Sequence, residues 1–172
     1  ARAIVEQALR MGVRASVATH GLDTGASIPL HFLVHDRHVP VVPVSIGEGS
    51  REDHRAWGEA IRAALQAFEG RAAFVVGGAL SWNLHAFNLK REMAECGEAD
   101  ALVLAALRDG AWATLPAIVE SLGEKARLEA DLRHLEVLRG FLRRDMAGVV
   151  HEYESTHGIG TALVEFILES RG

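Results

Sequence analysis

The sequence is poor in several residue types that define particular classes of protein. Its 172 residues include four prolines, one tyrosine and one cysteine, Cys96. A single cysteine excludes a disulfide scaffold and a thiolate metal site, and it predicts a reducing, cytoplasmic compartment. The Glu-rich segment around Cys96 predicts a raised thiol pKa and therefore a poor nucleophile. No apolar run approaches the roughly 18 residues that a membrane-spanning helix needs, so we expect no membrane partner.

Positive charge is also scarce. Lysine and arginine total 18 against 23 acidic residues, which gives a formal net charge of −5, and no run of basic residues is present. We therefore expect no nucleic-acid partner. The hydrophobic fraction of 49% and the charged fraction of 24% are typical of a folded domain and exclude a disordered chain.

Hydrophobic periodicity predicts alternating helices and strands. Helical spacing covers residues 1–11 and 51–68, and Ser50 with Asp53 forms a capping-box signature before the second of these. Short apolar segments predict strands at 13–18, 39–46 and 72–76, then at 149–153 and 161–167, although the last of these could equally be a helix. Residues 86–143 are mostly helical in pattern. The prediction is an α/β fold with a central mixed or mostly parallel sheet flanked by helices, and a helical C-terminal half that returns to late strands.

Four segments mix glycine with a few polar side chains in a defined order. They are Leu22–Leu30 (LDTGASIPL), Val39–Ser45 (VPVVPVS), Phe74–Leu84 (FVVGGALSWNL) and Tyr153–Gly160 (YESTHGIG). Together they resemble the class III extradiol ring-cleavage dioxygenases, in the catalytic B-subunit superfamily of protocatechuate 4,5-dioxygenase and DOPA dioxygenase. The corresponding family stretches read Leu-Asp-His-Gly, Ile-Pro-Val-Val and Leu-Ser-His-Asn-Leu, with Tyr-Glu-x-x-x-Gly-x-Gly near the end.

The resemblance implies a non-haem Fe(II) enzyme whose metal is held by two histidines and a carboxylate. A histidine after the Leu-Ser pair would act as the acid and base. In this chain Trp82 takes that place, and Thr24 replaces the histidine of Leu-Asp-His-Gly. Neither an indole nor a threonine hydroxyl can exchange a proton near neutral pH. By resemblance, the pocket comprises Asp23, Thr24, Gly77, Gly78, Ser81, Trp82 and Asn83.

Three other residues are candidates for the missing chemistry. His20 and His85 lie close in sequence to the two replaced positions and are the catalytic candidates, although a loop residue and a solvated helix start are the plainer interpretations. Glu154 is the candidate metal ligand, with a surface turn as the plainer interpretation. The resemblance covers about the last two thirds of the family domain. We therefore expect one extradiol-dioxygenase-like domain over residues 1–172, apparently lacking the family's N-terminal segment.

These observations favour a catalytically degenerate member of the family that serves as a structural or interaction subunit, without a cofactor. One alternative is an active Fe(II) dioxygenase whose other ligands lie upstream of Ala1 or in a partner chain. Another is a non-catalytic binder that stacks an aromatic small molecule on Trp82. The apolar residues between 102 and 122 exceed one buried stripe, and an uncovered sheet edge needs a partner, so we expect a homo-oligomer or a partner subunit.

Overall fold

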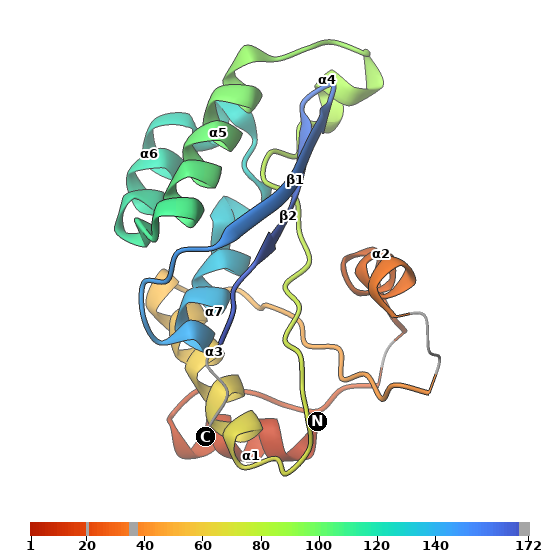
Figure 1. Ribbon diagram of the computed structural model, residues 1–172, viewed down its shortest axis with the longest axis vertical. Coiled ribbons are helices and arrows are strands. Elements are labelled where there is room, and N and C mark those ends of the chain that lie inside the picture. Colours follow the sequence, from red (N-terminus) through yellow and green to blue (C-terminus); the bar gives the residue numbers. More distant parts are fainter. Residues whose placement is uncertain (20, 35–37, 169–172) are drawn as a thin grey trace. The chain divides into compact units, whose positions relative to one another are not determined.

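The computed structural model describes residues 1–19, 21–34 and 38–168 (Figure 1). The chain divides into two compact units. The first unit comprises residues 1–77 and 133–143, and the second comprises residues 78–132 and 144–172. Each unit has its own set of packed helices, and each is described by itself.

The first unit is helical. Its elements are α1 (Arg2–Arg10), α2 (Thr24–Leu33), α3 (Arg51–Gln66) and α7 (Arg133–Leu142). The predicted capping box is confirmed, because the Ser50 hydroxyl accepts the Asp53 N–H at 3.1 Å and the Asp53 carboxylate accepts the Ser50 N–H at 2.8 Å. Helices α1 and α7 both pack against α3, which makes α3 the centre of this unit.

Helices α3 and α7 approach closely because each has a glycine at the contact. A Cβ atom at Gly58 would lie 1.9 Å from the Val137 carbonyl, and one at Gly140 would lie 1.9 Å from the Arg55 carbonyl. Beside this contact, Ile61, Val137 and Phe141 form a buried cluster. The sequence thus places small residues where backbones meet and large apolar residues where side chains fill the space.

Three segments predicted as strands in this unit do not pair. Residues 13–18, 39–46 and 72–76 form no β-ladder with any described part of the chain. Ile46 and Phe74 nevertheless pack against the Ile61, Val137 and Phe141 cluster. The prediction of paired strands here was wrong, because local β propensity does not by itself supply a hydrogen-bonded neighbour.

The second unit combines helices with a β-hairpin. Its elements are α4 (Leu84–Asn88), α5 (Ala94–Asp109), η1 (Trp112–Thr114), α6 (Leu115–Ala126), η2 (Glu129–Leu132), β1 (Val149–Thr156) and β2 (Ile159–Glu165). The strands are antiparallel, and Thr156 pairs with Ile159 next to the turn. The late strands are confirmed, and the mixture of helix and strand confirms the α/β class. Among the described residues, β1 and β2 are the strands that form a sheet.

The apolar residues of α5 and α6 are mostly buried inside this unit. Trp112 is fully buried, and its indole N–H donates to the Met146 carbonyl at 2.7 Å. Of the large apolar residues between 102 and 122, Leu102 is 44% exposed, Val119 and Leu122 are half-buried, and the others are buried. The excess expected to meet another subunit therefore has an intramolecular explanation. No helix in the described part of the chain is long and apolar enough to cross a membrane.

Candidate functional site

The segment from Leu80 to Asn83 is fixed on one side by the C-terminal motif. The Leu80 N–H donates to the Gly160 carbonyl at 2.8 Å, and the Gly160 N–H donates to the Ser81 carbonyl at 3.1 Å. The Asn83 N–H donates to the Gly158 carbonyl at 2.9 Å. The Leu-Ser-x-Asn-Leu and Tyr-Glu-x-x-x-Gly-x-Gly motifs are therefore adjacent in space, although about 75 residues separate them in sequence.

The same segment is fixed on its other side by the turn after α6. The Trp82 N–H donates to the Arg127 carbonyl at 2.8 Å, and the Glu129 N–H donates to the Leu80 carbonyl at 2.8 Å. The Glu129 carboxylate also accepts the Ala79 N–H. Main-chain hydrogen bonds on both sides leave the backbone of Trp82 little freedom to move.

A buried carboxyl joins the two motifs through their side chains. Asp100, on α5, is fully buried, and its Oδ2 accepts the Ser81 hydroxyl and the Tyr153 hydroxyl, both at 2.9 Å. Its Oδ1 has no hydrogen-bond partner in the described part of the chain. Burial raises the pKa of Asp100. Burial and the neighbouring Asp100 raise the pKa of Tyr153 to about 12, so Tyr153 remains a hydrogen-bond donor.

Two glycines of the C-terminal motif permit this arrangement. A Cβ atom at Gly160 would lie 1.7 Å from Asp100 Oδ2 and 3.0 Å from Ser81 Oγ. Gly158 has a φ of +85°, and a Cβ atom there would lie 3.0 Å from the Ala86 Cβ. The glycine pattern therefore serves the packing of the motifs around Asp100.

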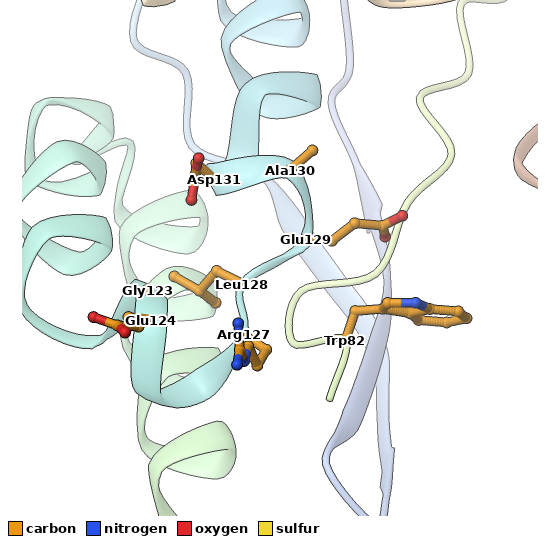
Figure 2. Close-up of a pocket in the computed structure, with 8 residues that line it drawn as sticks. All are labelled: Trp82, Gly123, Glu124, Arg127, Leu128, Glu129, Ala130 and Asp131. Carbon is orange, nitrogen blue, oxygen red and sulfur yellow. The ribbon is translucent and has the colours of Figure 1, made fainter. Parts of the chain in front are cut away.

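Trp82 is the exposed residue of the Leu80–Asn83 segment. Its side chain is 44% exposed and lines a hollow of about 410 Å³ with Arg127, Leu128 and Glu129. Figure 2 shows the indole and the Glu129 carboxylate extending toward the same side. Further lining residues come from the same turn and from the end of α6: Gly123, Glu124, Ala130 and Asp131. Trp82 thus presents an aromatic surface with no basic atom at the hollow.

The other pocket residues of this unit mostly have structural partners. Ser81 is fully buried and donates to Asp100, and Asn83 caps α4 by accepting the Ala86 N–H at 3.0 Å. His85 is the second residue of α4 and is exposed. Gly78 is exposed and precedes the buried Ala79.

The candidate metal ligand Glu154 lies on the hairpin. Its side chain is exposed, and its partner in the β1–β2 register is Thr161. His157, in the turn, points to a different carboxylate, because its Nδ1 lies 2.7 Å from Glu92 Oε1. No three histidine, cysteine, aspartate or glutamate side chains come together as a metal-binding group within residues 1–19, 21–34 and 38–168. The residues of the described chain therefore do not fit the iron site that the resemblance implies.

The remaining pocket candidates belong to the first unit. Asp23 caps α2 by accepting the Ala26 N–H at 2.9 Å, and Thr24 is the exposed first residue of that helix. Gly77 lies against this motif, because a Cβ atom there would be 2.2 Å from the Gly25 carbonyl. His20 lies outside the described residues.

Sequence reasoning found the motifs but missed Asp100. The signal was present, since Asp100 is a carboxylate in an otherwise apolar helical run, Ala99 to Leu104. The expectation for Cys96 is confirmed: it is buried, and desolvation with the nearby Asp100 and Glu95 raises its thiol pKa.

Comparison with known proteins agrees with the motifs. The family model for the catalytic LigB subunit of aromatic ring-opening dioxygenases matches residues 1–167. A search of curated proteins found no match. The match covers both compact units and all four motif segments. The chain belongs to the family of the catalytic LigB subunit of aromatic ring-opening dioxygenases.

Proposed function

We propose that this chain is a ring-opening-dioxygenase family member that does not cleave aromatic rings itself and serves as a structural or interaction subunit. The observation that carries the proposal is Trp82, an exposed indole with a fixed backbone that stands, by resemblance of the motifs, where the family has its acid–base histidine. An indole N–H donates a hydrogen bond but has no lone pair that could accept a proton from a catechol.

The neighbouring polar groups do not replace that function. Ser81 and Tyr153 both donate to the buried Asp100, and Asn83 caps a helix. A general base must reach the proton that it removes. These groups already make hydrogen bonds that hold the two motifs and the start of α4 in place. Ser81, Asn83 and Tyr153 thus have structural partners, and Trp82 stands where, by resemblance, the proton-exchanging residue would be.

Three further parts of the proposal concern the domain organisation, the cellular location and the association of the chain. The family match spans both compact units, which supports a single dioxygenase-like domain over residues 1–172. The lone, buried Cys96 supports a reducing, cytoplasmic location. A subunit of this kind acts through association, so we also propose a homo-oligomer or a partner subunit.

Ring-opening activity tests the proposal. The wild-type chain is loaded anaerobically with Fe(II), then mixed with oxygen and catechols, and ring-opened product is followed by its absorbance. We expect no product above a protein-free control, and the same result for Glu154→Gln and His85→Ala. Turnover that is lost in either variant would establish the alternative, an active Fe(II) dioxygenase that uses these residues with ligands from elsewhere.

A second candidate function is the binding of an aromatic small molecule. Trp82 supports it, since its exposed ring lines a hollow of about 410 Å³ and could stack on a planar ligand. Titration with catechol, followed by tryptophan fluorescence, tests this candidate. Saturable quenching that is lost in Trp82→Leu but retained in Trp57→Phe would support binding at the hollow. Identical titrations of both variants would exclude it.

A further inference from the structure

The hollow beside Trp82 combines an aromatic ring with an excess of negative charge. Its charged lining residues are Glu124, Arg127, Glu129 and Asp131. Three carboxylates and one guanidinium give the lining a formal charge of −2. A ligand that enters the hollow therefore meets a negative electrostatic potential.

These charges are not neutralised within the part of the chain that the structure describes. Neither the Arg127 guanidinium nor the carboxylates of Glu124 and Asp131 form an ion pair with another described residue. The Glu129 carboxylate accepts the Ala79 N–H, which is a neutral donor, so its charge also remains. The negative charge of the lining is thus available to a ligand.

The C-terminal end of α6 adds charge of the same sign. Gly123 and Glu124 from its last turn, and its C-cap residue Arg127, line the hollow. The carbonyl end of a helix carries about half a negative elementary charge. Lys125, the basic residue of this turn, is not one of the lining residues. The helix end therefore also favours a cation at the hollow.

The indole is an independent feature that favours the same kind of ligand. Trp82 is 44% exposed, and its N–H donates to the Arg127 carbonyl at 2.8 Å, so the exposed ring stands on a fixed backbone. Figure 2 shows the indole and the Glu129 carboxylate extending toward the same side. Tryptophan is the aromatic side chain that attracts cations most strongly. A flat ring with an ammonium group on a short linker suits this combination of a stacking surface and a carboxylate.

We propose that the hollow binds aromatic cations, of the arylalkylammonium class, in preference to neutral or anionic aromatic molecules. The proposal rests on the second candidate function, the binding of an aromatic molecule at Trp82, and adds the charge that this molecule carries. Three probes share a phenyl ring on a short linker and differ in charge: 2-phenylethylammonium, 2-phenylethanol and 3-phenylpropanoate. In isothermal titration calorimetry at low ionic strength, we expect the ammonium ion to bind about tenfold more tightly than the alcohol, and the carboxylate to bind most weakly.

Two substitutions change the charge of the hollow in opposite directions. Glu129→Gln keeps an acceptor for the Ala79 N–H and removes a negative charge, so it should weaken ammonium binding about three- to fivefold and leave the alcohol unchanged. Arg127→Gln removes the positive charge and should strengthen ammonium binding by a similar factor. Asp131→Asn changes an exposed carboxylate and provides a second test if circular dichroism shows that Glu129→Gln does not fold. Glu98→Gln, an exposed position on α5 that does not line the hollow, is the matched control and should bind like the wild type.

The outcomes separate this proposal from the function on which it rests. Equal dissociation constants for the three probes, or ammonium binding that none of the lining substitutions changes, overturns the preference for a cation but leaves an aromatic ligand at Trp82. No binding of the ammonium ion overturns the proposal, and saturable quenching by catechol would then show that the aromatic candidate still holds. Absence of binding by every probe and by catechol overturns both. Ring opening is measured separately with Fe(II) and oxygen.

Discussion

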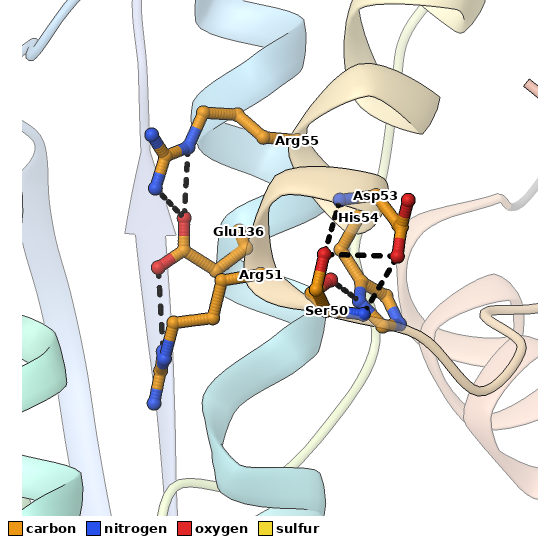
Figure 3. A network of polar contacts seen from close by, with 6 residues as sticks. All are labelled: Ser50, Arg51, Asp53, His54, Arg55 and Glu136. Atoms are coloured by element: carbon orange, nitrogen blue, oxygen red, sulfur yellow. Dashed lines mark hydrogen bonds and ion pairs between the residues drawn. The ribbon is translucent and has the colours of Figure 1, made fainter. Parts of the chain in front are cut away.

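The two units each bury a carboxylate, and they stabilise it by different means. In the first unit Glu136 is 1% exposed and faces two guanidinium groups: Arg55 Nη2 lies 3.0 Å from its Oε2 and Arg51 Nη1 lies 3.3 Å from its Oε1 (Figure 3). In the second unit Asp100 is fully buried, and among the described residues one of its oxygens has two hydroxyl donors and the other has none.

The two buried carboxylates therefore have different roles: Glu136 joins two helices, and Asp100 joins two family motifs. Glu136 is compensated by charge, and its contacts join α7 to α3 at the place where the glycines bring the helices together. Asp100 has no cationic partner among the described residues, and burial raises its pKa although the hydrogen bonds from Tyr153 and Ser81 act in the opposite direction. It links Ser81 of one family motif with Tyr153 of another. The family motifs are thus held by a network of neutral donors beside the position that Trp82 occupies.

The largest effect is expected from Gly140→Ala in the first unit. The new Cβ would lie 1.9 Å from the Arg55 carbonyl, and a backbone atom can move away only if the helices separate. We expect a loss of about 3–5 kcal/mol in the free energy of unfolding, measured by urea denaturation. Gly97→Ala is the control, since it lies inside α5 with no atom within 4 Å of the new Cβ, and it should stabilise by about 0.5–1 kcal/mol. Equal effects of the two substitutions would contradict the close helix contact.

Arg55→Met tests how Glu136 is compensated. The substitution keeps much of the side-chain volume but removes one of the two guanidinium groups, those of Arg51 and Arg55, that contact the buried carboxylate. We expect a loss of about 3 kcal/mol in the free energy of unfolding, because an under-compensated buried charge is costly. Arg55→Lys, which keeps the charge, should lose less. A neutral effect of Arg55→Met would show that the pair contributes nothing to stability.

His134 should make the first unit sensitive to acid. It is buried on α7, and burial lowers its pKa from 6.5 to about 4. Because the unfolded chain binds this proton more readily, stability is complete above pH 6.5 and falls as the pH drops toward 4, by about 3 kcal/mol. Urea denaturation between pH 7 and pH 4 should show a shallower decline in His134→Gln than in the wild type. Parallel curves would mean that His134 is protonated without cost in the folded chain.

Asp100 should have the opposite effect on the pH dependence of stability, in the second unit. Its pKa in the folded chain is raised above the unfolded value of 3.8, so its contribution is complete below that pH and is lost as the pH rises through the folded pKa. Asp100→Asn cannot ionise and should abolish this loss. The difference in unfolding free energy between wild type and variant, measured from pH 3 upward, should therefore change in favour of Asp100→Asn. A difference that is constant with pH would contradict the raised pKa.

The smallest effect is expected from Tyr153→Phe. The substitution removes one of the two hydroxyl donors to Asp100 and leaves the ring in place. We expect a loss of about 1 kcal/mol in the free energy of unfolding at pH 5. The Ser81→Ala variant removes the other donor. Because both donors share Asp100 Oδ2, the loss in unfolding free energy of the double variant should differ from the sum of the two single losses. Strict additivity would show that the two hydroxyls act independently.

Local features of the sequence predicted local features of the fold. The Ser50 and Asp53 capping box predicted the start of α3, and short apolar segments predicted β1 and β2. Pairing could not be predicted for residues 39–46 and 72–76, because it depends on which backbone lies alongside a segment and not on its own residues.

Only part of the candidate site could be predicted, because the rest depends on how distant segments pack together. The motifs named Ser81, Trp82 and Asn83, but the carboxyl that joins them to the hairpin comes from α5, which has no motif. Asp100 lies 19 residues from Ser81 and 53 from Tyr153, so its role follows from the packing of helix against hairpin. A lone acid in an apolar helical stretch is the signal that could have identified it.

The measurement closest to the central claim is the yield of ring-opened product from the wild-type chain supplied with Fe(II), oxygen and a catechol, compared with that of Trp82→Phe. The account predicts no turnover by either protein, since neither ring can exchange a proton at this position. Ring opening by the wild type, with iron bound in a one-to-one ratio, would contradict the account.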